Sequence, residues 1–279
     1  MTYCLKTNYL VYFILRPPEI AAGSGLKMSK AGVFLFIVML SAAPLLPGDE
    51  LPEWFTPLRD AIYSQTHTSR EIRGLYNIAW ERANRELSGV ELSVMLSRCE
   101  YMMGRSYVDE ENKKEAAACF ERGLRYAQES LDNMATPEGW QMMADNISYL
   151  CSVKSMAFIM ANGLKVDRYS KNALKLDSGN TTAQFLIAAR WVYAPTPLHN
   201  YRRGQQMMEA IIRDYDYRLH RDDRFNVYLA IGDAHNQQKR KEEARIWFLK
   251  AKEVYPDNKR VNGMLSGFRE QAIDWSTVN

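Results

Sequence analysis

The clearest periodicity of apolar and polar positions in this chain lies between residues 225 and 258. Four residues of its first half recur at intervals of three and four, and therefore share one helix face: Tyr228, Ile231, Gly232 and His235. Three residues of its second half repeat this spacing: Ala244, Phe248 and Ala251. The pattern predicts two consecutive helices that form a hairpin.

Small residues in this hairpin stand where two helix backbones must approach. Gly232 and Ala244 supply them, Phe248 is expected to fill the gap between hairpins, and Pro256 closes the unit. With these positions the segment resembles the tetratricopeptide repeat, whose 34-residue signature runs from an aromatic residue through Leu-Gly and Tyr to Ala, Phe and Pro. His235 departs from that pattern, because the family usually has Tyr there.

Further copies are expected, because one hairpin cannot bury its own apolar face. A second copy, starting at Ser97, keeps four of the family's positions, Gly104, Tyr107, Ala116 and Phe120, but has Glu100 where the first aromatic residue belongs. A third is clear only in its second helix, around 173–178, since its first helix at about 138–160 has no clear register. A fourth begins at Thr181 and is interrupted by a loop at 193–201.

The flanking segments also read as helices. Apolar spacing predicts them over 54–63 and 69–87, with Ser69 capping the second, and over 259–273. The last is expected to turn some residues to the core, Met264, Leu265 and Phe268, and others to solvent, Lys259, Arg260, Arg269 and Glu270. No strand pattern of useful length appears. The resemblance therefore implies an all-α, tetratricopeptide-like solenoid of helical hairpins over 52–272, wound in a right-handed superhelix with a C-terminal capping helix.

The N-terminal residues follow a different pattern. Residues 31–48 carry no charge, follow basic residues and include small residues near their end, which is typical of a secretory signal. We predict that 28–48 is a signal peptide or an N-terminal membrane anchor; a buried core helix is a further alternative. Met28 is then the expected start, and 1–27 a non-native upstream extension. Either membrane interpretation exports the repeats to the periplasm or to the outer face of the inner membrane.

The charge balance bears on possible partners. The chain has a formal net charge of +3 at pH 7. Residues 1–43 account for this excess through four basic residues and one acidic residue: Lys6, Arg16, Lys27, Lys30 and Glu19. The rest of the chain is near neutral, which argues against nucleic acid, since phosphate binding needs a basic surface.

Candidate catalytic and metal-binding chemistry is sparse. The four histidines lack metal-ligand spacing, and no nucleophile-elbow, phosphate-loop or dinucleotide motif occurs. We therefore expect no enzymatic activity, no cofactor and no metal. Asp222 and Asp223 beside His220 are interpreted as the start of a helix that they cap. Cys99 and Cys119 are expected to be small buried residues, and a disulfide between them is the alternative that an exported protein permits.

In the tetratricopeptide family the first helices of the hairpins line a concave groove that holds a peptide or a partner helix. The resemblance implies a groove with a mixed aromatic and charged lining: Arg98, Tyr101, Arg105, Phe185, Tyr193, Asn226, Asp233 and Asn236. The loop that ends at Tyr201 is expected to border the groove, because insertions in helical repeats often map to the binding face. The groove lacks the Lys/Arg/Asn clamp with which some repeats grip an acidic C-terminus.

The expected function is that of an exported, non-enzymatic scaffold that binds a protein or peptide partner and touches a membrane only through its N-terminal segment. The alternative is a periplasmic helical-repeat accessory of a tripartite solute-uptake system. Such an accessory would enclose an apolar ligand channel, for which the sequence offers four methionines: Met142, Met143, Met156 and Met160. A hydrolytic or lytic helical domain is a third possibility.

Overall fold

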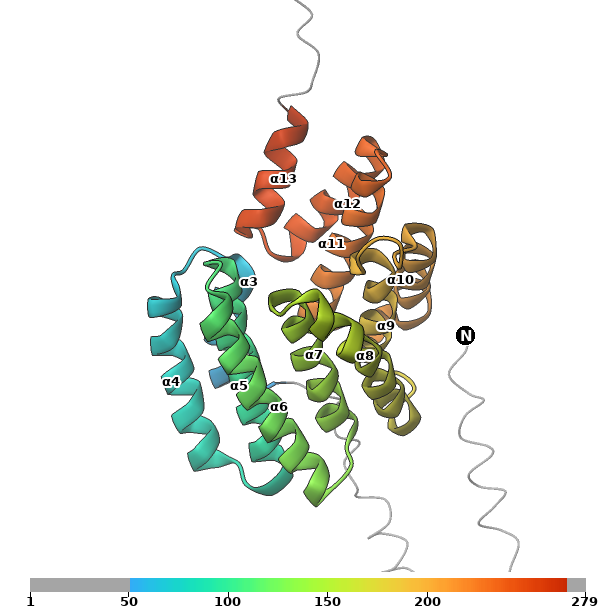
Figure 1. Ribbon diagram of the computed structural model, residues 1–279. Helices are drawn as coiled ribbons and strands as arrows, with labels where there is room; N and C mark the ends of the chain where they lie inside the picture. Colours follow the sequence, from blue (N-terminus) through green and yellow to red (C-terminus); the bar gives the residue numbers. More distant parts are fainter. Residues whose placement is uncertain (1–50, 270–279) are drawn as a thin grey trace, which may run out of the picture. The chain divides into compact units, whose positions relative to one another are not determined.

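The computed structural model describes residues 51–269, in which every regular element is a helix (Figure 1). The predictions for 1–27 and 28–48 lie outside the described residues. The helices, in chain order, are η1 (Glu53–Phe55), α3 (Thr56–Ser64), α4 (Ser69–Glu86), α5 (Gly89–Asp109), α6 (Lys113–Asn133), α7 (Pro137–Val153), α8 (Met156–Leu176), α9 (Thr181–Tyr193), α10 (Tyr201–Tyr215), η2 (Asp216–Arg218), α11 (Arg221–Gln237), α12 (Lys241–Val254) and α13 (Lys259–Arg269).

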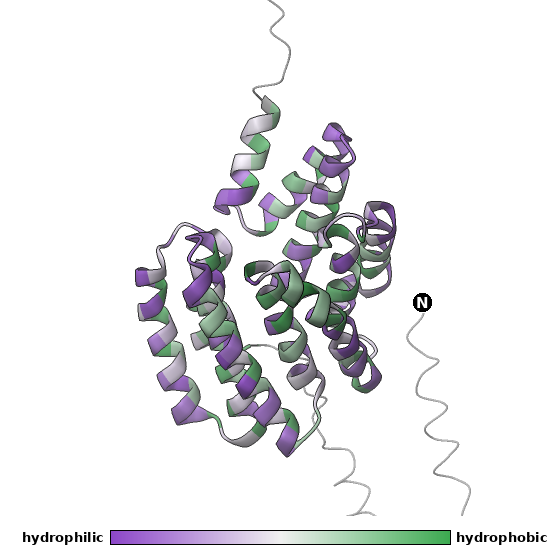
Figure 2. Cartoon of the chain, viewed as in Figure 1, coloured by the Kyte–Doolittle hydropathy of each residue, from purple (hydrophilic) through white to green (hydrophobic). Residues whose placement is uncertain are grey.

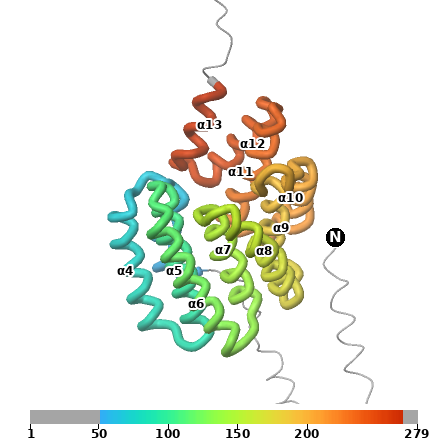
Figure 3. The backbone as a smooth tube through the Cα atoms, viewed as in Figure 1, coloured from blue at the N-terminus to red at the C-terminus, as the bar shows by residue number. Residues whose placement is uncertain are grey.

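Neighbouring helices pair as hairpins. Helix α5 packs on α6, α7 on α8, α9 on α10 and α11 on α12, and each hairpin also contacts the next, as the chain trace shows (Figure 3). Helix α13 packs on α12 as the last helix of the described part. The predicted all-α solenoid of helical hairpins is therefore confirmed. The hairpin whose first helix had no clear register consists of α7 and α8, joined at Lys154 and Ser155.

Two glycines fix the register of the first and last predicted repeats. A Cβ atom on Gly232 would lie 2.5 Å from Cε1 of Phe248, and a Cβ atom on Gly104 would lie 2.5 Å from Cε1 of Phe120. Each phenylalanine ring thus packs directly on the backbone of the preceding helix, where no side chain has room. The equal spacing of the two pairs along the chain shows that both hairpins use the same contact.

Replacing Gly232 by leucine is expected to destabilise the protein by about 1–3 kcal/mol, because the new side chain overpacks the contact with Phe248. The midpoint of urea unfolding measures this loss. Gly74→Leu in α4 is the matched control, since nothing lies within 4 Å of a Cβ atom there. It should leave stability unchanged or slightly raised, because leucine favours helix over glycine. Equal midpoints for the two variants would contradict the assigned register.

Hydrogen bonds of short polar side chains start several of the helices. Thr68, and not Ser69, caps α4: its hydroxyl accepts from the backbone N–H of Glu71, and the Glu71 carboxylate accepts from the N–H of Thr68. This reciprocal pair satisfies two free donors at the helix start. Ser69 was a plausible cap by residue type, but it is the first residue inside the helix.

Each helix carries both apolar and polar residues (Figure 2), and the buried apolar side chains form two core clusters. One core cluster joins α3 to α8 with parts of α9 and α11 to α13, and a second fills the space between α9, α10 and α11. Phe55, Phe120 and Phe248 are fully buried anchors of the first. Among the helices that the structure describes, none is both long enough and apolar enough to span a membrane.

The capping helix α13 follows the prediction in part. Leu265 is buried, and the Phe268 ring stacks on Phe248 at 6.0 Å between centroids. Val261, which the sequence pattern did not single out, is fully buried. Arg260, expected to face solvent, is exposed as predicted and in addition binds Asp233 of α11, as described below.

The two cysteines that were candidates for a disulfide are both free and buried. Burial raises the pKa of both the Cys99 and the Cys119 thiols, to about 12 in each case. A thiol with such a pKa is protonated at neutral pH and therefore unreactive. The interpretation of Cys99 and Cys119 as small buried residues is confirmed.

Candidate functional site

The first helices of successive hairpins form one continuous surface. Helix α5 packs beside α7, α7 beside α9, and α9 beside α11; we call this surface the inner face. Most of the predicted groove residues lie on these four helices: Arg98, Tyr101 and Arg105 on α5, Phe185 and Tyr193 on α9, and Asn226, Asp233 and Asn236 on α11. Tyr201 is instead the first residue of α10.

An arginine surrounded by tyrosines lies at the centre of the inner face. The guanidinium carbon of Arg105 is 5.6 Å from the ring centroid of Tyr101 and 5.7 Å from that of Tyr149 on α7. The two rings meet edge to face, with centroids 5.2 Å apart. An arginine over aromatic faces is held by the ring quadrupoles, so these contacts fix the two predicted residues against α7. Tyr149 was not predicted, because the register of its helix could not be read from the sequence.

A third tyrosine reaches this arginine from α3. The Tyr63 ring lies 4.3 Å from the guanidinium carbon of Arg105. On its other side it contacts the last repeat, where its hydroxyl oxygen accepts a hydrogen bond of 3.0 Å from Nδ2 of Asn226. The predicted residues Arg105 and Asn226 therefore meet through a residue outside the predicted repeats. Burial raises the pKa of Tyr63, so the phenol stays neutral.

A second network joins α9, α11 and α13. The Tyr193 hydroxyl donates to Oδ2 of Asp233 at 2.7 Å, and Arg260 donates to the same oxygen at 2.7 Å. Asp233 is buried beneath these two side chains, and burial raises the pKa of its carboxyl group, an effect that Arg260 opposes. The structure thus brings Tyr193 and Asp233 together as the groove prediction implies. It also corrects the placement of Arg260, which pairs with a buried carboxylate and does not simply face solvent.

Buried carboxyl groups lie deeper along the inner face. Asp145 on α7 is only 6% exposed, and burial raises the pKa of its carboxyl group to about 7, against the opposing charge of Arg98. Arg98 thus lies close enough to Asp145 for its charge to act on this carboxyl group, which the sequence did not indicate. Asp223 on α11 accepts hydrogen bonds from the hydroxyls of Thr181 and Thr182 on α9, and burial raises its pKa as well.

These contacts overturn the interpretation of Asp222 and Asp223 as capping residues. The N-cap of α11 is His220, and its side chain makes no capping hydrogen bond. Asp222 instead accepts a hydrogen bond of 2.6 Å from the Tyr255 hydroxyl. Acidic residues at the start of a helix often cap it. Here both side chains instead point toward neighbouring helices and accept hydrogen bonds there.

Three predicted residues have other surroundings. Phe185 packs against both core clusters. The Tyr201 ring stacks on His199 at 4.4 Å and packs against the core between α9 and α10. Asn236 is partly buried near the end of α11. The loop at 194–200 therefore has one end, Tyr193, at the inner face and the other, Tyr201, in a local core.

The methionine channel of the alternative function does not form. Met142 and Met143 on α7 are buried in the core, whereas the side chains of Met156 and Met160 on α8 are 55% and 66% exposed. Four residues divided between a packed core and open solvent cannot line one enclosed channel. Within residues 51–269 no group of histidine, cysteine, aspartate and glutamate side chains is arranged to hold a metal ion.

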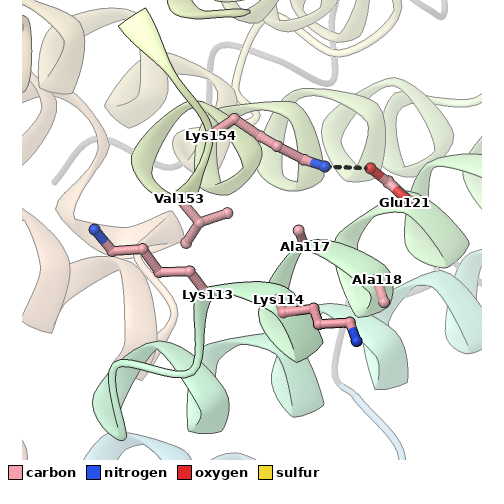
Figure 4. A pocket seen from close by; sticks show the side chains of 7 residues that line it. All are labelled: Lys113, Lys114, Ala117, Ala118, Glu121, Val153 and Lys154. Atoms are coloured by element: carbon pink, nitrogen blue, oxygen red, sulfur yellow. Dashed lines mark ion pairs between the residues drawn. The ribbon is translucent and has the colours of Figure 1, made fainter.

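A shallow pocket of about 420 Å³ lies away from these clusters, between the start of α6 and the end of α7 (Figure 4). Lys113, Lys114 and Lys154 line it, and Lys154 pairs with Glu121 at 2.8 Å. Its small apolar floor of alanine and valine offers few directed polar contacts. This pocket therefore does not compete with the inner face as a candidate site.

Comparisons with known proteins gave matches to parts of this chain. Residues 101–130 and 198–259 each match a family model described as tetratricopeptide repeat. Among solved structures, one match is described as the crystal structure of YrrB, a TPR protein with an unusual peptide-binding site; it is 16% identical, covers 77% of this chain and 90% of that chain, and has a TM-score of 0.33. The comparison with curated proteins returned no match.

Proposed function

Because this chain contains tetratricopeptide repeats, we propose that it is a non-enzymatic scaffold that binds a protein or peptide partner on its inner face. The observation that carries the proposal is the convergence of arginine and tyrosine side chains from α5, α7, α9 and α13 on that face. Tyrosine and arginine are the residue types most enriched among side chains that dominate binding energy at protein interfaces.

The accessible part of this surface is the network of Tyr193, Asp233 and Arg260. The side chains of Tyr193 and Arg260 are 50% and 43% exposed, while both bind the buried Asp233 carboxylate. Their positions are thus set by a buried partner while their outer surfaces stay open to solvent. Side chains that are already fixed lose little conformational entropy when a partner binds.

Tyr193→Ala is expected to weaken partner binding about tenfold or more, because it removes an aromatic anchor from the interface. The partner is first isolated by a pull-down with the full chain from the native envelope fraction. Its affinity is then measured by calorimetry for the wild type and the variant. The melting temperature should fall only modestly, since half of the Tyr193 surface is already in solvent and Arg260 still binds the Asp233 carboxylate.

Two variants separate binding from packing. Tyr217→Ala is the matched surface control, because Tyr217 on η2 is 83% exposed, and it should leave affinity unchanged. Tyr201→Ala tests the other end of the loop, where we expect lost stability from the core between α9 and α10. If Tyr193→Ala binds as tightly as Tyr217→Ala, the inner face is not the binding surface.

We further propose that the protein is exported, on the basis of the uncharged stretch that follows basic residues at 28–48. The repeats would then act in the periplasm or at the outer face of the inner membrane. Fusion of residues 28–50 to a reporter that is active only outside the cytoplasm tests the proposal. A reporter that remains cytoplasmic would refute export and leave the binding proposal intact.

A further inference from the structure

Helix α3 has two faces with different contacts. Phe55, just before the helix, and Leu58 and Ile62 within it are almost fully buried, and α3 packs on α4 and α5. This apolar side holds α3 to the first hairpin of the described chain. The burial of these apolar side chains against α4 and α5 stabilises the attachment of α3 to the first hairpin.

The other side of α3 carries polar residues that reach the last repeat. Nε of Arg59 lies 3.5 Å from Oδ1 of Asp222, and Oδ2 of Asp60 lies 3.2 Å from a guanidinium nitrogen of Arg221. We call Arg59, Asp60 and Tyr63 the latch. The Asp60 and Arg221 side chains are 38% and 43% exposed, so water weakens this ion pair. The Arg59 and Asp222 side chains are more buried, at 17% exposure each.

Tyr63 supplies the main contact of the latch. Its ring stacks on Tyr255 with centroids 4.9 Å apart and meets Phe225 edge to face at 5.6 Å. Together with Arg105 and Asn226, these two rings form the seat of Tyr63. The side chain of Asn258, before α13, also donates to the backbone carbonyl of Tyr63. The seat thus takes an aromatic side chain that carries a hydrogen-bond acceptor at its tip.

These contacts are unusual for a helical-repeat solenoid. In such a fold each repeat contacts only its neighbours along the chain. Four hydrogen bonds between the α3 region and the last repeat instead join residues 161, 163 and, twice, 195 positions apart. Figure 1 shows α3 beside α5 with the start of α13 close by. The latch therefore closes the solenoid on itself across the inner face.

We propose that the latch is an internal competitor for the partner site, and that a partner helix displaces it from the seat. The partner would present an aromatic residue three positions after an acidic one, which is the spacing of Asp60 and Tyr63 in α3. The apolar contacts of α3 with α4 and α5 remain, and the solenoid opens between its first and last hairpins. This inference rests on the proposed function, because it assigns the chemistry of the partner to the same inner face.

The affinity of the partner then depends on how often the latch is open. A tethered competitor acts at an effective concentration in the millimolar range. If the latch is closed in about 90% of molecules, the apparent affinity for a partner is about tenfold weaker than the intrinsic affinity. Variants that open the latch should therefore bind the partner about tenfold more tightly, although they make no new contact with it.

The test uses the full chain and a fluorescent synthetic peptide of residues 52–66, which carries the latch sequence. Tyr63→Ala empties the seat and is expected to bind the peptide about tenfold more tightly than the wild type does. Asp60→Arg places like charges at Arg221 and should give a smaller gain in the same direction. Arg221→Asp added to Asp60→Arg restores the ion pair and should return the affinity toward that of the wild type.

Two controls keep the result specific. A peptide in which the residue equivalent to Tyr63 is alanine should not bind any variant, because it cannot fill the seat. Small-angle scattering gives a readout that needs no peptide: the radius of gyration should increase in Asp60→Arg and return in the charge-swapped double variant. Circular dichroism must show full helix content in each variant, above all in Tyr63→Ala, because Tyr63 is itself buried in the core.

Equal peptide affinity and equal radius of gyration in the wild type and the variants would overturn the proposal. So would loss of helix content in Asp60→Arg, because α3 would then be an inseparable part of the core. Failure here is distinct from failure of the proposed function. A partner that depends on Tyr193 but binds the wild type and Tyr63→Ala equally would refute the latch and leave the scaffold proposal standing.

Discussion

Replacement of Arg122 by methionine is expected to lower the free energy of unfolding by about 3 kcal/mol, because it leaves a buried carboxylate without its counter-ion. Glu100 on α5 is 2% exposed, and its two oxygens each accept a hydrogen bond of 2.7 Å from the Arg122 guanidinium on α6. The Tyr76 hydroxyl on α4 donates to the same carboxylate at 3.2 Å. One acidic group thus joins three helices.

Urea denaturation measures this loss, and two further variants interpret it. Arg125→Met on the same helix removes an exposed charge and should cost almost nothing. Glu100→Gln combined with Arg122→Met removes the buried charge as well, and should recover most of the stability. The expected loss of unfolding free energy in Arg122→Met is at the low end of the range for buried ion pairs, because the Arg122 side chain is 38% exposed and water reaches it. Equal effects of Arg122→Met and Arg125→Met would show that the pair contributes no stability.

Asp145→Asn is expected to stabilise the protein at pH 8 and to have little effect at pH 4. Burial raises the pKa of Asp145 to about 7 in the folded protein, against an ordinary value of 3.8. The folded state therefore holds this proton more tightly than the unfolded state, so stability falls as pH rises from about 4 to about 7 and the penalty is constant above that range. A shift of roughly three pKa units corresponds to at most about 4 kcal/mol.

Melting curves of the wild type and the variant between pH 4 and pH 8 test this expectation. Asp145→Asn keeps only part of its gain in stability at pH 8, because the variant also removes the carboxylate that lies near Arg98. Asp222, Asp223 and Asp233 also have raised pKa values, so the variant keeps some pH dependence and the difference between the two curves isolates Asp145. Asp214→Asn, at an exposed position, is the control and should give no such difference. Parallel curves for the wild type and Asp145→Asn would contradict a buried, protonated carboxyl group.

The buried pair at Glu100 also explains a departure of this chain from the repeat pattern. Glu100 stands where the family's signature begins with an aromatic residue, and the second predicted repeat therefore lacked its first anchor. The structure fills this position with a carboxylate that Arg122 and Tyr76 bind. The sequence showed that the aromatic residue is missing. It did not show that a buried carboxylate takes its place, because neither Arg122 nor Tyr76 stands at a position of the family signature.

The sequence indicated on which helices several of the candidate residues lie. The spacing of small and aromatic residues gave the register of the last repeat, and this register placed Arg105, Asn226 and Asp233 on first helices that share one face. The resemblance to the repeat family likewise placed Tyr193 on this face. These placements were possible because helix periodicity and close helix packing are local properties, which a few residue types at fixed intervals specify.

Other members of the site were out of reach of the sequence. Tyr149 lies in a helix without a readable register, and Arg260 looked like a solvent-facing charge on a terminal helix. Asp222 and Asp223 satisfied the local rule for helix caps, yet their partners are Tyr255 and two threonines on another helix. A buried polar side chain is identified by what surrounds it, and its surroundings come from distant parts of the chain.

The sequence by itself determined the all-α architecture of helical hairpins and the register of the two repeats that contain Gly104 and Gly232, because periodicity within a helix and small residues between helices are encoded locally. Only the tertiary structure decided that α3 crosses this face and places Tyr63 between Arg105 and Tyr255. The residues in these contacts are up to 195 positions apart. No local sequence pattern specifies a contact between residues so far apart in the chain. Such a contact depends on how the small rotations between successive hairpins add up along the solenoid.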